Sequence, residues 1–215
     1  MAISMPRMDR LPADERGVTI GDFLVPIRLS ERLGVRVRHV GLVIAGALLI
    51  ALCARLYFFL PGSPVPYTAQ TFGVLLAGGA LGFKRGLAAS TLYIAIGAIG
   101  LPVFAQGRAG LEVGYGATGG YLVGFILAAA LVGRLAELGW DRSIWGGMAA
   151  MLLGSVVIYA VGVPWLAVTP YGGDLGVGVG NGLLPFLVWD AVKLALAGVA
   201  FPLAWWFVGR RPGDR

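Results

Sequence analysis

Long apolar segments dominate this sequence, and short stretches that hold the charged residues separate them. Six segments have the character of membrane helices, which need about 20 apolar residues to cross a bilayer. We expect helices at residues 40–60, 68–83, 86–101, 118–138, 144–163 and 183–208. The second and third are short for a full crossing, so they should thin the bilayer or lie sheltered among their neighbours. The pattern predicts an all-α integral membrane protein with six transmembrane helices.

Composition supports this prediction. Only 13% of the 215 residues are charged and the mean hydropathy is +0.82, whereas roughly a quarter of the residues in a soluble domain are charged. Lipid must therefore cover part of the surface. We expect one membrane domain over residues 39–209, preceded by a basic segment, residues 1–38, and followed by a short tail, residues 210–215.

The basic residues predict the orientation of the chain. Fourteen of the 17 Lys and Arg residues fall in the N-terminal segment, the second and fourth loops and the tail, which share one side of a six-helix layout. Arg108 stands alone in the loops of the other side, and Arg55 and Lys193 fall within spans. Because Lys and Arg accumulate in cytoplasmic loops, we expect both termini in the cytoplasm. Charge spread over helix ends gives no indication of nucleic-acid binding.

The end of the basic segment predicts an additional helix at the membrane surface. Basic residues and apolar residues occupy different faces of this helix-compatible stretch: Arg28, Arg32, Arg36 and Arg38 against Leu29, Leu33 and Val37. Such a helix lies along the headgroups. The segment shows no short apolar run with a cleavage site, so we expect no signal peptide.

The loops of the outer side have the composition of a ligand site. The loop at residues 102–117 and the start of the next helix interleave glycines with aromatic and polar residues: Phe104, Gln106, Arg108, Glu112, Tyr115 and Tyr121. Such groups on a closely approaching backbone suit a lid over a small molecule. Residues 171–182 include six glycines, which indicate either a flexible linker or a second part of this lid.

The strongest chemical signal is the pair Asp190 and Lys193 in the last predicted span. The two residues are three apart and therefore share a helix face. Each costs about 2.5–3.5 kcal/mol near the centre of a bilayer, so the pair requires a partner or a cavity. It is either a salt bridge that ties two helices together or a polar anchor at the bottom of an outward-facing pocket. As the lone outer-loop cation, Arg108 either attracts an anionic substrate or is an ordinary solvated charge.

Motifs of enzymatic chemistry are missing from the sequence. It has no G-x-x-x-x-G-K-[ST], H-E-x-x-H or G-x-S-x-G motif. One histidine, His39, and one cysteine, Cys53, do not make a metal site. We therefore expect a protein that is not an enzyme and carries no cofactor. The alternative of an intramembrane enzyme with Asp190 as general acid or base needs a nucleophile or metal that the sequence does not supply.

Five segments, in order, resemble the BioY family, the biotin-specific S components of energy-coupling-factor (ECF) transporters. They are Pro64-Val-Pro-Tyr-Thr-Ala-Gln-Thr-Phe72, Gly97-Ala-Ile-Gly-Leu-Pro-Val-Phe104, Gly119-Gly-Tyr-Leu-Val-Gly-Phe125, Gly162-Val-Pro-Trp-Leu166 and Asp190-Ala-Val-Lys193. The resemblance covers roughly residues 40–205. It implies an ECF S-component-like fold in the bacterial cytoplasmic (inner) membrane that binds biotin under the outer loops for uptake.

The resemblance also implies partners. An Ala-xxx-Ala face on the first helix, matched by Ala47 and Ala51, would dock to a transmembrane T component, and ATPase subunits would supply energy. A solitary transporter acting as a homo-oligomer, an S component for another vitamin and a purely structural subunit stay open as alternatives.

The chemistry of biotin fits the residues singled out above. In this hypothesis Asp190 accepts hydrogen bonds from the ureido nitrogens, and Lys193 meets the ureido carbonyl or the carboxylate. Arg108 or Gln106 meets the carboxylate tail. The apolar ring is enclosed by Tyr93, Phe104, Tyr121 and Trp165, and Gly119 completes the candidate set.

Overall fold

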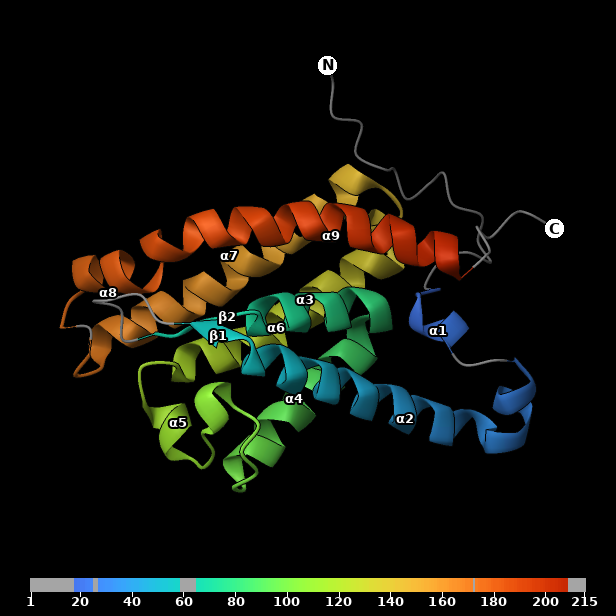
Figure 1. Cartoon of the computed structure of the whole chain (residues 1–215), viewed down its shortest axis with the longest axis horizontal. Helices are drawn as coiled ribbons and strands as arrows, with labels where there is room; N and C mark the ends of the chain where they lie inside the picture. Colours follow the sequence, from blue (N-terminus) through green and yellow to red (C-terminus); the bar gives the residue numbers. More distant parts are fainter. Residues whose placement is uncertain (1–17, 25–26, 59–64, 172, 209–215) are drawn as a thin grey trace, which may run out of the picture.

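The computed structural model describes residues 18–24, 27–58, 65–171 and 173–208. Its elements are α1 (Gly21–Leu24), α2 (Ile27–Arg55), β1 (Tyr57–Phe58), β2 (Tyr67–Thr68), α3 (Gln70–Leu81), α4 (Phe83–Ala98), η3 (Ala105–Gly107), α5 (Glu112–Tyr115), α6 (Gly119–Glu137), η4 (Trp140–Arg142), α7 (Ile144–Val168), α8 (Leu175–Gly182), η5 (Leu184–Phe186) and α9 (Leu187–Phe207). Long helices lie side by side, with α5, α8 and the β1–β2 hairpin at one end and α1 at the other (Figure 1).

Six long helices, α2, α3, α4, α6, α7 and α9, coincide with the six predicted segments. Four stretches are long and apolar enough to cross a membrane: Arg36–Arg55, Gly119–Glu137, Ile144–Val168 and the nearly continuous helical stretch Leu175–Phe207. Helix α3 has only 12 residues, most of them buried, and packs against α2, α4 and α6. It is therefore sheltered among its neighbours, while the count of six full crossings stays a prediction.

The basic N-terminal segment and the first span are separate pieces of helix. Within α2, Gly34 has a positive φ of 69°, a conformation that glycine adopts without a steric penalty, and it breaks the helix before the apolar stretch begins. The predicted interfacial helix is thus helical over residues 27–33. Residues 1–17, the side chains of Arg28 and Arg32, and the tail at 210–215 lie outside the described residues.

Several predicted boundaries were wrong, and three of them differ by four or five residues. Helix α2 ends at Arg55 rather than at residue 60, because Tyr57 and Phe58 pair with Thr68 and Tyr67 in a hairpin. Helix α7 continues past Pro164 to Val168, since Leu166 and Ala167 beyond the proline are buried in the packed interior. The last long helix begins at Leu187 rather than at residue 183, after the short turn η5.

Most of the glycine-rich stretch at residues 171–182 is helical, where the sequence indicated a linker or a lid: α8 covers Leu175–Gly182. Asp174 caps the helix, because its Oδ1 accepts from the Val177 N–H at 2.8 Å. A Cβ at Gly178 would lie only 3.1–3.4 Å from Ala167 and the Val163 carbonyl of α7. Glycine here permits close packing of two helices rather than chain flexibility.

The two residues of the predicted docking face on the first helix differ in exposure, and docking to a T component stays a prediction. Ala47 is only 2% exposed and belongs to the protein's own core, and Ala51 packs against the same core. The small residues of this pair let the neighbouring helices approach α2 from inside the bundle. Ala47 is therefore not available to a partner in this structure.

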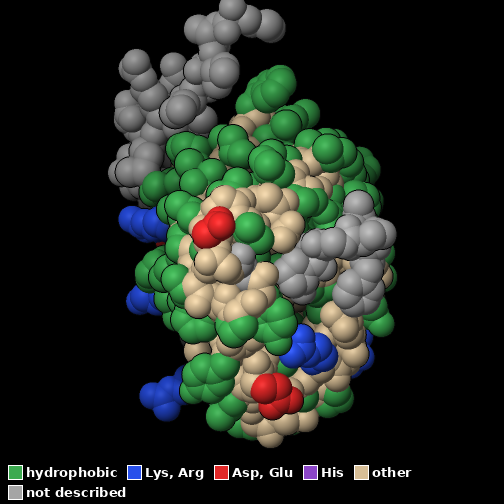
Figure 2. Space-filling model, turned by 90° about the vertical axis from the view of Figure 1, so that its left-hand side faces the viewer, with side chains coloured by type: hydrophobic (Ala, Val, Ile, Leu, Met, Phe, Trp, Pro, Cys, Tyr) green, Lys and Arg blue, Asp and Glu red, His purple; other side chains and the backbone are tan. Residues whose placement is uncertain are grey.

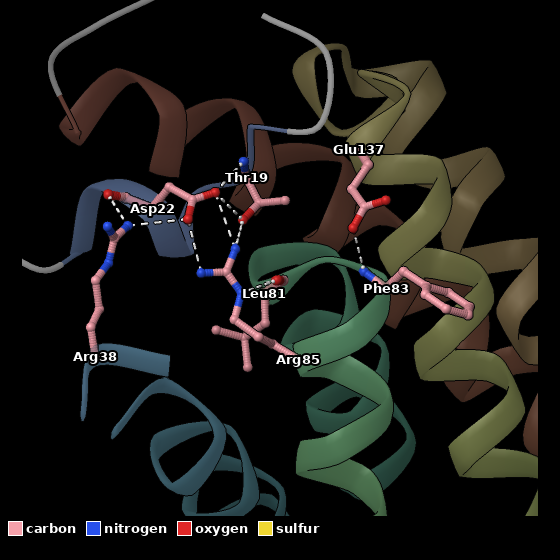
Figure 3. Close-up of polar contacts among 7 residues, drawn as sticks. All are labelled: Thr19, Asp22, Arg38, Leu81, Phe83, Arg85 and Glu137. Atoms are coloured by element: carbon pink, nitrogen blue, oxygen red, sulfur yellow. Dashed lines mark hydrogen bonds and ion pairs between the residues drawn. The ribbon is translucent and has the colours of Figure 1, made fainter. Parts of the chain in front are cut away.

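At the end of the molecule that holds α1, acidic side chains form ion pairs and hydrogen bonds that connect neighbouring helices (Figure 3). The Asp22 carboxylate pairs with Arg85 at 2.9 Å and with Arg38 at 3.1 Å, which ties α1 to α4 and α2. Burial alone would raise the pKa of Asp22, but hydrogen bonds from Arg85 and Thr19 outweigh it and hold this pKa below its usual value. On the other side of the α3–α4 turn, Glu137 accepts from the Phe83 N–H at 2.9 Å.

Another carboxylate at this end, Asp141 in the turn η4, is only half satisfied. It is 1% exposed, and its Oδ2 accepts from the Trp205 indole N–H at 2.8 Å. Its Oδ1 is buried with no hydrogen-bond partner among the described residues. Burial raises the pKa of Asp141 to about 7, against the opposing effects of the Trp205 hydrogen bond and the Arg142 charge.

We predict that Asp141→Asn stabilises the protein at alkaline pH. The folded-state pKa lies above the unfolded value of about 4, so stability falls as pH rises from about 4 to 7 and stays reduced above that. Asn keeps an acceptor for Trp205 and carries no charge. Thermal unfolding of the purified protein should show a higher Tm for Asp141→Asn at pH 8 and a difference that vanishes near pH 4. The control is Glu112→Gln, which removes an exposed carboxylate; equal pH profiles for Asp141→Asn and the parent would contradict the prediction.

Candidate ligand-binding site

A cavity lies under the hairpin and the outer loops. Its lining comes from the hairpin, the start of α3, the residue 102–117 loop and helices α6, α7 and α9: Val65, Pro66, Thr68, Gln70, Thr71, Phe104, Ala105, Gln106, Arg108, Val113, Thr118, Tyr121, Leu122, Phe125, Tyr159, Phe186 and Lys193. The space between the lining atoms and at the mouth is about 650 Å³. A cavity of this size suits a small molecule.

Two basic residues line this cavity, Arg108 and Lys193, and Lys193 is the one that lies within a predicted membrane helix. Its ammonium donates to Thr71 Oγ1 at 2.7 Å and to Asp190 Oδ1 at 3.0 Å. The Lys193 and Asp190 side chains are 12% and 11% exposed. An ammonium carries three N–H donors, and these two acceptors on described residues leave one donor for a ligand.

Asp190 stands behind Lys193 and does not line the cavity. Its Oδ1 accepts from Lys193, and its Oδ2 accepts a short hydrogen bond from the hydroxyl of Tyr159. Tyr159 itself lines the cavity. Three helices therefore meet at one polar cluster, with Thr71 from α3, Tyr159 from α7 and the ion pair from α9.

Aromatic rings form much of the wall. Tyr67 stacks on Phe186 with ring centroids 4.2 Å apart, and Phe58 stacks on Tyr67 at 5.1 Å. Tyr121 meets Tyr159 edge to face at 6.3 Å, and its hydroxyl donates to the Gly182 carbonyl at 2.8 Å. The first two contacts join the hairpin to η5, and the contacts of Tyr121 join α6 to α7 and α8. Phe186, Tyr121 and Tyr159 line the cavity directly.

The loop at residues 102–117 is fastened to the helices below it. The end of the Phe104 ring packs against Gly97 of α4, where an added Cβ would come within 2.3 Å of the ring. The guanidinium of Arg55 donates to the Pro102 carbonyl. Gln106 adopts a φ of 63°, which is uncommon for a residue other than glycine and stores local strain.

The outer end carries few charges. Figure 2 views the molecule from this end and shows mostly apolar and uncharged surface, with isolated basic and acidic groups. Arg108 is exposed and lines the cavity, so its guanidinium stands where an anion would enter. The basic residues Arg38, Lys84, Arg85 and Arg134 gather instead around the opposite end of the helices.

The family model of the BioY family matches residues 28–210. The chain belongs to the BioY family. It is 38% identical over 158 residues to "Biotin transporter BioY" of Thermotoga maritima, covering 74% of this chain and 91% of that protein. It is also 38% identical over 143 residues to "Biotin transporter BioY" of Rhizobium etli, covering 63% of this chain and 75% of that protein.

A solved structure shares the fold of this BioY chain. It is described as a crystal structure at 2.1 Å of the S-component for biotin from an ECF-type ABC transporter, and it matches with a TM-score of 0.71 and 27% identity. The match covers 78% of this chain and 90% of the other. The expected ECF S-component-like helical membrane fold is thereby confirmed.

The sequence-predicted site residues of this BioY protein divide into two layers. Five of them line the cavity: Phe104, Gln106, Arg108, Tyr121 and Lys193. Asp190, Tyr93, Trp165 and Gly119 lie behind that lining. Tyr93 is fully buried, accepts from the Gln70 amide at 3.0 Å and donates to the Val103 carbonyl at 3.2 Å.

Trp165 and Gly119 hold the end of the same loop. The Trp165 indole N–H donates to the Gly116 carbonyl at 3.0 Å. A Cβ at Gly119 would come within 1.8 Å of the Gly114 carbonyl oxygen, so the loop backbone can reach α6 only over a glycine. These residues support the cavity wall, and direct contact of any of them with a ligand stays a prediction.

Sequence reasoning missed several lining residues, above all Gln70, Thr71 and Tyr159. A signal was present for each, because a polar side chain within a span usually faces the interior of the bundle. Phe125 and Phe186 gave no such signal, since a phenylalanine in an apolar helix can equally face lipid.

We predict that Gly119→Ala destabilises this BioY protein by displacing the loop from α6. Overpacking of this kind costs about 1–3 kcal/mol, which lowers Tm by roughly 2–10 °C for a chain of this size. The matched control is Gly114→Ala, where a Cβ meets no atom within 4 Å. Thermal unfolding of both variants checks the prediction, and equal Tm values for the two would contradict it.

Proposed function

We propose that this protein binds biotin at the outer face of the bacterial cytoplasmic membrane and takes it up as the substrate-specific S component of an ECF-type transporter. The observation that carries the proposal is the Lys193 ammonium, which reaches an aromatic cavity from within a membrane helix. A T component and ATPase subunits would complete the transporter. In this arrangement both termini lie in the cytoplasm and residues 39–209 form the substrate-binding domain.

The lining offers a partner for each part of biotin. The ureido carbonyl accepts the free N–H of Lys193, and the hydroxyls of Thr71 and Tyr159 lie beside it for the ureido nitrogens. Phe104, Tyr121 and Phe186 enclose the thiophane ring. The carboxylate tail points to the mouth, where Arg108 and Gln106 lie. Burying the tail's charge beside a guanidinium favours an anion over a neutral analogue.

Asp190 acts on the ligand through Lys193 in this proposal. Both of its oxygens already accept hydrogen bonds, from Lys193 and Tyr159, and it lies outside the cavity lining. It neutralises the ammonium and fixes its direction. A direct bond from Asp190 to a ureido nitrogen, as expected from the sequence, would require the Tyr159 hydroxyl to give way.

We predict that Lys193→Ala loses biotin affinity by at least about tenfold, since a hydrogen bond from a charged group contributes about 1.5–3 kcal/mol. Equilibrium binding of biotin to the detergent-purified protein is the measurement, with thiamine and riboflavin as competitors. Lys84→Ala, which removes an exposed ammonium at the opposite end, is the control. If the folded parent does not bind biotin, or binds thiamine or riboflavin equally well, the proposed substrate is wrong.

We further predict that Tyr159→Phe and Asp190→Asn both weaken biotin binding, the second more strongly. Phe keeps the ring and frees one Asp190 oxygen, which loosens the ion pair and should lower affinity about fivefold to tenfold. Asn leaves the Lys193 charge uncompensated. Affinities are compared after thermal unfolding has established that both variants are folded. An Asp190→Asn protein with the parent's affinity would remove Asp190 from the site altogether.

A further inference from the structure

A second cavity lies at the opposite end of the helices from the candidate ligand site. It is lined by His39 of α2, by Leu81, Phe83, Lys84 and Arg85 around the α3–α4 turn, and by Arg134 and Glu137 of α6. The space between its lining atoms and at its mouth is about 900 Å³, compared with about 650 Å³ for the outer cavity. Nothing in the proposed biotin uptake uses it.

The lining is cationic and its shape is held in place. Lys84, Arg85 and Arg134 face a single acidic residue, Glu137. The Arg85 guanidinium forms an ion pair with Asp22 of α1 at 2.9 Å and donates to the Leu81 carbonyl at 2.8 Å, as Figure 3 shows. Arg134 pairs with Glu137 at 3.0 Å. Within the described part of the chain no carboxylate lies within ion-pair distance of Lys84, so its ammonium stays available to an anion.

The cavity borders on the surface that lipid tails would cover. On α2, the apolar side chains of Val40 and Ile44 are exposed just after His39. On α4, Leu87 is exposed one turn after Lys84. The aromatic ring of Phe83 is also exposed at the rim. Cations at the edge of an apolar helix surface match a molecule that joins a negative headgroup to hydrocarbon chains.

We propose that this cavity binds the headgroup phosphate of an anionic phospholipid, with the acyl chains lying along α2 and α4. The Lys84 ammonium supplies the charge that contacts the phosphate. Arg85 is held by Asp22 and Arg134 by Glu137, and both guanidinium groups shape the wall and add to its positive potential. A soluble phosphate would gain only the electrostatic part of this interaction, because it has no chains to place on Val40, Ile44 and Leu87.

The test is lipid binding to the purified full chain, measured by native mass spectrometry in a neutral detergent. The probes are phosphatidylglycerol and phosphatidylcholine with the same acyl chains. We expect phosphatidylglycerol to bind preferentially and Lys84→Gln to weaken its binding about fivefold, since one cation near a lipid headgroup contributes about that factor. Arg134→Gln should act in the same direction. Arg36→Gln is the matched control, because Arg36 is exposed on α2 and lies outside the lining.

Three outcomes would overturn the proposal. Equal losses in Lys84→Gln and Arg36→Gln would mean diffuse attraction to a basic surface. Equal binding of the two lipids would mean that headgroup charge is not recognised. Displacement of phosphatidylglycerol by glycerol phosphate at a similar concentration would identify a site for soluble phosphate. Biotin affinity measured on the same Lys84→Gln sample separates this result from the proposed uptake function.

Discussion

An ammonium group placed among membrane helices must be surrounded by oxygen atoms, and the outer half of this molecule is arranged around that requirement. The Lys193 ammonium donates to Asp190, one turn away on α9, and to Thr71 of α3. The hydroxyl of Tyr159 on α7 donates to the second oxygen of the Asp190 carboxylate. Losing any of these partners would leave a buried polar atom unpaired, which costs far more than an exposed one. The cluster therefore fixes how three helices meet, and the cavity opens directly above it.

Glycines position the rings that enclose this cavity. Phe104 lies on Gly97, and Tyr121 lies against Gly162, where an added Cβ would come within 2.4 Å of its ring. Behind the lining, a Cβ added at Gly120 would come within 2.2 Å of the Trp165 Cβ. Each glycine lets one aromatic side chain pack closely against a helix backbone. Hydrogen bonds to the Gly182 and Gly116 carbonyls fix the Tyr121 and Trp165 rings further.

The sequence predicts the helices well because lipid and core impose the same demand for apolar residues over a fixed length. It predicts Lys193 for the converse reason, since a charge within a span is too costly to be incidental. The environment of Ala47 could not be predicted in this way. An alanine on a helix face suits contact with a partner protein and contact with a helix of the same chain equally, and the packing of the structure shows that Ala47 is buried within the chain. The helix α8 was missed because glycine disfavours a helix in isolation, whereas here it permits close contact with α7.

The partners in the Lys193 cluster have two different roles: Asp190 balances the charge, and the hydroxyls of Thr71 and Tyr159 orient the ion pair. Asp190 neutralises the ammonium from the same helix, three residues away, so the charge balance of α9 does not depend on how α9 packs. Thr71 and Tyr159 belong to other helices, and their hydroxyls direct the pair without adding charge. A shift of α9 against α3 or α7 would therefore break hydrogen bonds but would never separate two buried charges. Because the large electrostatic cost is settled within one helix, the hydrogen bonds from Thr71 and Tyr159 are left to set how α9 packs against α3 and α7.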